Sequence, residues 1–487
     1  MMTQPFFRRC GALAVPLALA ALTAGCTVGP DYKRPELNPP PVVRGQPAAP
    51  SPESLADAGW WQVFDDPVLQ GLIREGLANS LDVRIASARV VEARALAGIA
   101  KSYRYPEVNV GFGWSGEQAT RLGDPPLSKE ASPDRTYYNW ALNGTVSWDV
   151  DLFGRLRRGQ EAAFARYLAT EEGRRGVLVA LVGDIASTYF LLGELDLQLE
   201  IARRTLKIND QTVAYYSTRL GGGVSNRLEV DQAKANRAVT AATIPGIEQQ
   251  IALTENALSV LLGRPPAPIA RGRSIVEQKA PPGIPAGLPA QLLERRPDVL
   301  QAERLLVAAN ADIGSAKALF YPTISLTGSA GSVSHSLSDF MRPDALVWSV
   351  GAGLLQPIFN GNRIKRNYEA AKARYDQALG AYQAAALNSY REVADSLVTI
   401  AKLAQQRVEY EAGVEALRDA TNLSRSRYDT GLSSYLEVLI ADQQLFQQEL
   451  QLAVTRGEEF RALAQFYRAL GGGWQPEQPG VPPAGVK

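Results

Sequence analysis

Four short segments place apolar residues at every second position, which is the period of a β-strand with one apolar face. Residues 106–116 carry Val, Val, Phe and Trp in this way, and residues 138–151 carry Trp, Leu, Val and Trp. Residues 322–334 and 346–358 repeat the alternation in the second half of the chain. We therefore predict four amphipathic strands of about ten residues, the length of a tilted membrane strand.

The segments between the strands show the period of a helix instead. From Leu181 to Leu206 the apolar residues alternate steps of four and three, which is a heptad seam. The helical pattern extends from about residue 155 to 220, which corresponds to roughly 100 Å of helix. The returning segment keeps the seam as far as Leu261, and Pro245 is expected to kink or break it. An earlier helix is expected from Asp65 or Asp66, as N-cap, to about Lys101.

The two halves of the chain resemble each other. Lys317, Tyr321 and Pro322 repeat Lys101, Tyr105 and Pro106 after 216 positions. The sequence Leu-Glu-Val occurs at 228–230 and again at 436–438, in both cases just after a glycine-containing turn. Each half reads helix, strand, strand, long helix, tip, helix, which gives four strands and six helices. We predict a first repeat at 60–263, a connector at 264–293, a second repeat at 294–473 and a tail at 474–487.

The N-terminus has the features of an export signal. Arg8 and Arg9 precede an apolar run at 11–22, too short to span a bilayer comfortably. The sequence Leu-Thr-Ala-Gly before Cys26 resembles the lipobox of bacterial lipoproteins, which implies removal of residues 1–25 and an S-diacylglycerol and N-acyl group on Cys26. An ordinary signal peptide cleaved nearby is the alternative. Thr27, in place of aspartate, implies sorting to the outer membrane, and the proline-rich residues 26–59 would form a lipidated tether.

Composition excludes several classes of protein. The chain has 51 basic and 50 acidic residues, so no broad basic field indicates nucleic-acid binding. With a single histidine, His335, a two-histidine metal site is impossible, and we predict no metal and no cofactor beyond the lipid. No P-loop, GxSxG or HExxH pattern occurs, so we expect no enzyme, and His335 is expected in an exposed loop.

Four strands cannot close a membrane barrel, which needs about eight or more, and open strand edges cannot face lipid. Three chains would supply twelve strands. We therefore predict an α+β membrane protein: a trimeric twelve-stranded barrel continued by a long α-helical barrel, because helices begin within a few residues of the strand ends. A solid coiled-coil bundle beside a small sheet would leave the alternating strands unexplained. Four arginines at this boundary are expected to anchor at the lipid surface rather than contact substrate: Arg155, Arg158, Arg363 and Arg366.

Several motifs together are similar to those of the TolC/OprM outer membrane factor family, the NodT-type efflux lipoproteins. The motifs are Leu22–Cys26, Trp60-Trp61 with Asp66-Pro67, Arg295–Val299, Phe320–Pro322, Gln356–Phe359, Arg427-Tyr428 and Tyr435–Leu439. The resemblance implies a homotrimeric channel in the outer membrane that extends into the periplasm. It implies a passive exit duct for drugs or other small molecules, docked to a periplasmic adaptor and an inner-membrane transporter of the resistance-nodulation-division (RND) type.

The same resemblance implies a gate at the periplasmic tips of the helices. Leu436 matches a leucine of the constriction, and Glu437 matches the first of two acidic positions that line the aperture. The second acidic position falls on Ile440, and Asp442 would face about 200° away from it on a helix. A leucine ring with one glutamate ring is therefore expected, and a solvated helix face is the alternative for Glu437.

Tyr428 matches a family tyrosine that hydrogen-bonds an acidic residue of the other hairpin, here Glu229, and so implies a latch for the closed state. Ser433 replaces an arginine of the TolC-like members, so a salt-bridge latch is not expected there. Gly223 and Gly431 match tip turns that face the adaptor, and plain turn glycines are the alternative.

Two other functions remain open from the sequence. The same fold could serve type I protein secretion, which the identity of the co-purifying adaptor would reveal. The chain could also be a periplasmic adaptor or structural lipoprotein. Adaptors contain one helical hairpin and a lipoyl-like β-domain. This chain instead has two hairpins, and its strands alternate apolar and polar residues as lipid-facing strands do.

Overall fold

The computed structural model describes residues 27–37, 44, 64–118, 120, 136–279 and 295–472. It divides into two compact units. The first comprises Met1–Pro35, Glu92–Ala169 and Glu303–Ala381, and the second comprises Glu36–Val91, Thr170–Ala302 and Tyr382–Lys487. The signal peptide, Cys26, the Trp60-Trp61 pair and the tail at 474–487 lie outside the described residues, as does most of the loop between the first two strands.

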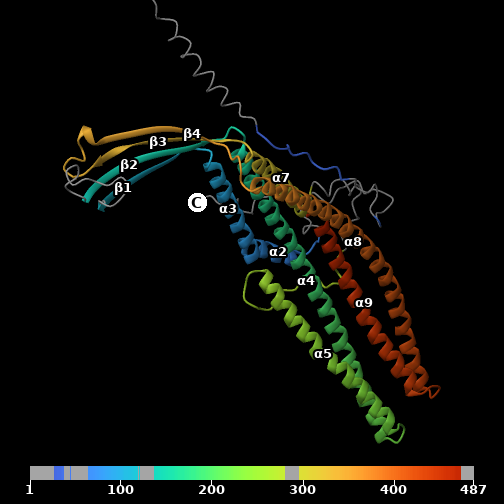
Figure 1. Cartoon of the computed structure of the whole chain (residues 1–487). Coiled ribbons are helices and arrows are strands. Elements are labelled where there is room, and N and C mark those ends of the chain that lie inside the picture. Colours follow the sequence, from blue (N-terminus) through green and yellow to red (C-terminus); the bar gives the residue numbers. More distant parts are fainter. Residues whose placement is uncertain are drawn as a thin grey trace, which may run out of the picture. The chain divides into compact units, whose positions relative to one another are not determined.

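The first unit contains a four-stranded antiparallel sheet in the order β1-β2-β3-β4 (Figure 1). Its strands span Glu107–Gln118, Thr136–Val150, Thr323–Ser334 and Leu346–Leu355. Each strand end lies within three residues of its predicted position. The largest difference is at β4, which ends at Leu355 instead of 358, because Pro357 has no N–H to continue the ladder.

The register gives this sheet one apolar and one polar face. Phe112 lies opposite Leu142, and Trp114 lies opposite Trp140 with their rings 6.2 Å apart. On the other face the paired positions carry amides, hydroxyls and glycine, as in Asn109↔Thr145, Gly111↔Asn143 and Thr145↔Ser329. Within one chain β1 and β4 each have a single neighbour, so both outer edges are left for pairing with another copy.

Two 67-residue helices leave this sheet, and each start is fixed by a short polar residue. Asp151 accepts hydrogen bonds from the N–H groups of Leu156 (3.0 Å) and Arg157 (2.7 Å), which caps α4 (Arg155–Gly221). Asn360 accepts from the N–H of Ile364 at 3.4 Å at the start of α8 (Arg363–Asp429). The strands therefore pass into helices within a few residues, as the sequence predicted.

The α4 helix packs closely on α7 (Pro297–Ala318) inside the first unit. Their contact is an alanine cluster, Ala162, Ala165, Ala308 and Ala311, all almost fully buried. Small side chains allow two helix backbones to approach closely.

One predicted lipid anchor is wrong. The Arg158 side chain is only 7% exposed, and its guanidinium pairs with Asp31 at 2.6 Å and Glu161 at 2.8 Å. An arginine whose side chain is buried and whose guanidinium pairs with two carboxylates is not available to a lipid headgroup. Arg155 remains partly exposed and pairs with Asp149 at 3.2 Å, and Arg366 is exposed.

The segment from Pro67 to Ser102 forms two helices where one was predicted, and it belongs to the second unit as far as Val91. The α2 helix (Pro67–Asn79) ends at Ser80, whose N–H donates to the carbonyl of Gly76, and α3 (Leu81–Ser102) begins directly after it. Asn and Ser favour such breaks because their side chains compete with the helix backbone. Asp66 is the N-cap of α2 and accepts from the N–H groups of Val68 and Leu69.

The core of this unit forms around the predicted heptad seam of α4. Leu181, Ile185 and Leu192 are buried there together with Phe190, whose ring stacks on Phe460 at 5.1 Å. The partners come from α2, from α5 (Arg227–Leu261) and from α9 (Tyr435–Ala469). The α5 helix continues through Pro245, so of the two predicted outcomes, a kink or a break, the break does not occur: one missing N–H is tolerated inside a packed helix.

Among the described residues, α4 is also the one helix long and apolar enough by composition to cross a membrane. More than half of that apolar window is buried inside the protein, where it supplies the core just described. Its hydrophobicity is therefore explained by packing.

Candidate gate at the helical tips

The two hairpin tips have the same backbone design. At the end of α4, Gly223 has φ +73°, and Val224 donates its N–H to the carbonyl of Arg219. At the end of α8, Gly431 has φ +76°, and Leu432 donates to Arg427. This is a Schellman motif, in which a left-handed residue closes the helix. A Cβ at either glycine would meet nothing within 4 Å, so backbone conformation rather than space requires glycine.

The helices that follow the tips differ in how they begin. At α5, the Asn226 side chain accepts from the N–H of Glu229, and the Glu229 carboxylate accepts from the N–H of Asn226. This capping box is reinforced by the Ser225 hydroxyl, which also donates to Glu229. At α9 the N-cap Ser434 makes no side-chain cap bond. The first hairpin therefore has the more firmly fixed tip.

A cluster of tyrosines, here called the tip cluster, joins the two hairpins. The buried Tyr216 ring of α4 lies 4.5 Å from Tyr435 of α9 and 5.5 Å from Tyr428 of α8. Burial raises the pKa of Tyr435 to about 12, so its phenol is neutral at physiological pH. No local pattern in the sequence indicates this cluster, because its members come from helices about 200 positions apart.

The edge of the tip cluster is polar. The Tyr215 hydroxyl donates to Asp429 at 2.9 Å and accepts from Arg219 at 2.8 Å. The Arg219 guanidinium lies 5.4 Å from the centroid of Tyr215 and 5.6 Å from that of Tyr428, within cation–π range. These contacts again connect α4 with the end of α8.

The Tyr428 phenol interacts with the Glu229 carboxylate across the two hairpins. Burial raises the pKa of Tyr428, and the negative charge of Glu229 and a hydrogen bond to it raise it further. The Glu229 carboxylate, which accepts the hydrogen bonds that hold the start of α5, thus also lies close enough to Tyr428 of the second hairpin to act on its phenol. The two residues predicted as a latch lie together in the structure.

The first turns of α9 have a buried and an exposed face. Tyr435, Val438 and Ala441 are buried, whereas Leu436 is 51% exposed. Glu437 is exposed beside it and lies 3.7 Å from Arg427. The two residues predicted to line the gate therefore share the free face of the helix.

Asp442 lies on the buried side of the same helix. Its carboxylate is 2.8 Å from the Arg425 guanidinium of α8 and only 10% exposed. Burial raises the pKa of Asp442, which the neighbouring Arg425 partly counteracts. Asp442 is thus committed to the contact between α8 and α9. It does not lie on the exposed face with Leu436, Glu437 and Ile440.

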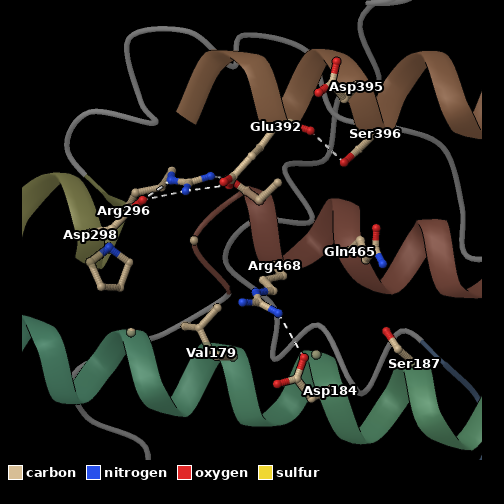
Figure 2. A pocket seen from close by; sticks show the side chains of 16 residues that line it. Val179, Asp184, Ser187, Arg296, Asp298, Glu392, Asp395, Ser396, Gln465 and Arg468 are labelled. Atoms are coloured by element: carbon tan, nitrogen blue, oxygen red, sulfur yellow. Dashed lines mark hydrogen bonds and ion pairs between the residues drawn. The ribbon is translucent and has the colours of Figure 1, made fainter. Parts of the chain in front are cut away.

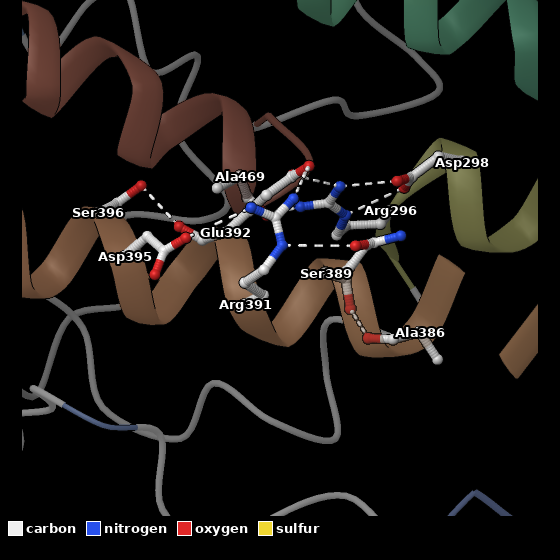
Figure 3. A network of polar contacts seen from close by, with 10 residues as sticks. Arg296, Asp298, Ala386, Ser389, Arg391, Glu392, Asp395, Ser396 and Ala469 are labelled. Carbon is white, nitrogen blue, oxygen red and sulfur yellow. Dashed lines mark hydrogen bonds and ion pairs between the residues drawn. The ribbon is translucent and has the colours of Figure 1, made fainter. Parts of the chain in front are cut away.

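A second polar site, a cavity of about 520 Å³, lies elsewhere in the same unit (Figure 2). Arg296, part of the Arg295–Val299 motif, binds Asp298 through two nitrogens at 3.0 and 2.7 Å and Glu392 of α8 at 2.8 Å. It also donates to the carbonyl of Ala469 at the end of α9 (Figure 3). Across the cavity Arg468 faces Asp184 at 2.9 Å.

This Arg296 network connects three helix segments far apart in the sequence. Its guanidinium is almost fully buried, yet both carboxylates are partly exposed, so the charges are balanced and hydrated on one side. The arrangement stabilises the start of α7 against α8 and the end of α9. We therefore interpret it as a structural clamp rather than a binding site.

The chain matches the family model described as "Outer membrane efflux protein" over residues 72–264 and 288–472. It is 35% identical to "Cation efflux system protein CusC" of Escherichia coli O6:H1, covering 95% of this chain and 98% of the relative. It is 34% identical to "Solvent efflux pump outer membrane protein SrpC" of Pseudomonas putida (96% and 99%). Identity to "Probable outer membrane lipoprotein SilC" of Salmonella typhimurium is also 34% (93% and 97%).

Solved structures show the same likeness. A crystal structure of CusC superposes with a TM-score of 0.81 at 33% identity and covers 92% of this chain and all of that one. The open-state MtrE channel of Neisseria gonorrhoeae gives 0.82 at 27% identity, covering 92% and 98%.

The chain belongs to the outer membrane efflux protein family. It is an outer-membrane channel, the exit duct of a tripartite efflux pump, and it works as a homotrimer with a periplasmic adaptor and an inner-membrane RND transporter. It spans the outer membrane with a β-barrel of four strands per chain and extends into the periplasm as an α-helical barrel. These statements agree with what the motifs of the sequence implied.

Proposed function

We propose that the helical tips are the gate of this channel. Leu436 narrows the mouth, Glu437 charges it, and the Tyr428–Glu229 contact holds the second hairpin against the first. The observation that supports this most directly is the free face of α9, on which Leu436 and Glu437 are exposed while Tyr435 and Val438 are buried against the tip cluster.

The gate carries one ring of acidic side chains rather than two. Glu437 supplies it, and the nearby Arg427 partly neutralises its charge. Asp442 is engaged with Arg425, and Ile440 is uncharged. A weak preference for cations is therefore expected at this mouth.

The turns at Gly223 and Gly431 are the surfaces that face the adaptor. Next to them Val224 is 67% exposed and Leu432 is 71% exposed. Exposed aliphatic side chains on a rigid turn suit the contact with another helical hairpin. The alternative remains that these glycines serve the turn alone.

Cys26 is the lipidation site, with residues 1–25 removed. The described chain begins one residue later, at Thr27, which lies against Gly154 at the junction of β2 and α4. A lipid on the preceding residue would start beside the ends of the membrane strands. The relative SilC is itself named an outer membrane lipoprotein.

The duct conducts small molecules delivered by the pump, without selecting among them by charge inside the membrane. The polar face of the sheet carries amides, hydroxyls and glycines over most of its length. The relatives are named for cations and for solvents, two very different cargoes. Selection of the cargo by the inner-membrane transporter, rather than by the channel, is consistent with such a range of cargoes.

The chain is an internal duplication, with repeats at 60–263 and 294–473. The corresponding helices have equal lengths: 22 residues for α3 and α7, 67 for α4 and α8, and 35 for α5 and α9.

The experiment that tests the gate is the conductance of the purified trimer in a planar bilayer, with Leu436→Ala and Glu437→Gln variants. We expect Leu436→Ala to raise the conductance and Glu437→Gln to reduce the preference for cations. Equal conductance and selectivity in both variants and the wild type would place the gate elsewhere.

A further inference from the structure

The loop between β3 and β4, residues 335–345 and here called the outer loop, lies at the end of the sheet opposite to the starts of α4 and α8 (Figure 1). Because those helices extend into the periplasm, this end of the barrel faces the cell exterior. The loop joins two neighbouring strands, and a short connection of this kind has no need to leave them. Its contacts nevertheless lie on the other two strands, so the loop bends sideways across the sheet.

The outer loop crosses the apolar face of the sheet. Phe340 is only 8% exposed, and its ring lies 6.5 Å from that of Phe112 in a T-shaped contact. Phe112 belongs to β1, which is separated from β3 by β2, and it shares the apolar face with Leu142. The His335 ring, exposed as the sequence predicted, donates through Nδ1 to the carbonyl of Tyr138 on β2 at 3.0 Å. Both contacts draw the loop from β3 towards β1.

The outer end of β3 is short of large side chains on this apolar face. Ser332 lies opposite Leu142 of β2, and Ser334 lies opposite Trp140. Two hydroxyls thus stand where the neighbouring strand has large apolar side chains. Membrane strands normally carry aromatic residues near their ends on the lipid-facing side. Phe340 supplies from the loop an aromatic ring that β3 itself lacks.

The polar groups of the outer loop bond to one another. The Ser336 hydroxyl donates to the Asp339 carboxylate at 3.2 Å, and the Asp339 N–H donates back to the carbonyl of Ser336 at 3.3 Å. Arg342 pairs with Asp339 at 3.2 Å. Polar groups that are satisfied locally lower the cost of placing a loop at a lipid boundary. Met341, next to Phe340, is 88% exposed, which leaves a large apolar side chain free to meet that lipid.

We propose that the outer loop is folded against the lipid-facing side of the barrel, with Phe340 as its anchor and Met341 in contact with lipids of the outer leaflet. The partner is lipid because the face on which Phe340 packs is continuous with the face that the barrel presents to the bilayer. A loop held there stays clear of the mouth of the duct. The proposal concerns the membrane barrel and is independent of the gate at the helical tips.

A spin label at position 341 tests the lipid contact. Met341→Cys trimers are labelled with a nitroxide and reconstituted into phosphatidylcholine vesicles. Collisions of the label with oxygen, which concentrates in the bilayer, are compared with collisions with a water-soluble nickel chelate. The wild type, treated in the same way, corrects for label on the two native cysteines. We expect the ratio of oxygen to nickel collisions to be several times higher for Met341→Cys than for Ser349→Cys, on the polar face of β4, and close to that of Trp348→Cys, on the apolar face.

Phe340→Ala, added to Met341→Cys, tests the anchor. It removes the ring that packs on Phe112, so the loop should turn towards water and nickel collisions at position 341 should rise severalfold. Val347→Ala is the matched control, because it shortens an apolar side chain on the polar face of β4 and should leave the label in lipid. All variants are first shown to migrate as trimers, so that unfolding is not mistaken for release of the loop.

The two halves of the proposal fail separately. A label at position 341 that collides with nickel as often as the label at position 349 would overturn the lipid contact. A label that stays in lipid after Phe340→Ala would leave the lipid contact and overturn Phe340 as its anchor.

Discussion

Removing the Tyr428 hydroxyl is the cleanest way to weaken the gate. In Tyr428→Phe the ring stays in the tip cluster against Tyr216 and Tyr435, so packing is retained. Glu229 keeps its bonds from Ser225 and from the N–H of Asn226, so no buried charge is left without a partner. The substitution therefore removes the interaction between hairpins and little else, whereas Glu229→Ala would also remove the capping box of α5.

The size of the effect follows from the contact. The contact of a phenol with a carboxylate contributes at most what a shielded hydrogen bond to a charged group does, about 1.5–3 kcal/mol. Tyr428 is only partly buried, so we reduce this to about 1 kcal/mol for each protomer. Three identical contacts that break together on opening give about 3 kcal/mol for the trimer. Because 1.4 kcal/mol is a factor of ten, the ratio of open to closed channels should rise about 150-fold.

Single-channel recording of the trimer in a planar bilayer measures this ratio directly as the fraction of time spent at the high-conductance level. Tyr410→Phe is the control, because it removes a hydroxyl from the same helix about 27 Å from Tyr428. The reasoning fails if Tyr428→Phe opens no more often than the wild type, or if Tyr410→Phe opens equally often.

Further predictions concern charge and backbone. Burial raises the pKa of Asp442 above its ordinary value of 3.8, so the folded state binds this proton more tightly and loses stability as pH rises through the folded pKa. Asp442→Asn should therefore flatten the dependence of thermal unfolding on pH in the range directly above the ordinary pKa of 3.8. Arg296→Lys keeps the charge but loses the fork that binds Asp298, Glu392 and a helix end, and should lower the free energy of unfolding by about 2 kcal/mol in thermal scans. Gly263→Ala should destabilise by about 1–3 kcal/mol, because its φ is +73° and the new Cβ would lie 2.3 Å from a backbone oxygen. The control Gly98→Ala should not destabilise the protein, because a Cβ at this position on a helix would meet nothing within 4 Å.

The sequence predicts this protein well where structure follows from local periodicity. The strands and the long helices were placed by their two-residue and heptad patterns, because burial of one face dominates the choice of secondary structure there. The break at Ser80 was missed, since it depends on a local competition between a side chain and the backbone that changes no apolar period.

The pairing of side chains could be predicted only where family motifs indicated it. Tyr428 and Glu229 were proposed from such a motif. Tyr215 and Asp429 are 214 positions apart, and nothing in either neighbourhood indicates that they meet. Arg158 looked like a membrane anchor, because its partner Asp31 lies 127 positions earlier in a proline-rich segment with no regular pattern. Partnerships of this kind depend on how helices are brought together, which periodicity does not encode.

The middle of the polar face of the sheet, where the side chains are small and uncharged, has a consequence for the permeability of the outer membrane. A barrel lined by Asn143, Thr145 and Ser329 offers an incoming antibiotic as little resistance as an outgoing one. Impermeability of the outer membrane would then depend, wherever this trimer is inserted, on the tip alone. Bacteria that express a tip variant with a loosened mouth should become more sensitive to large antibiotics normally excluded by their envelope, even while the pump continues to export.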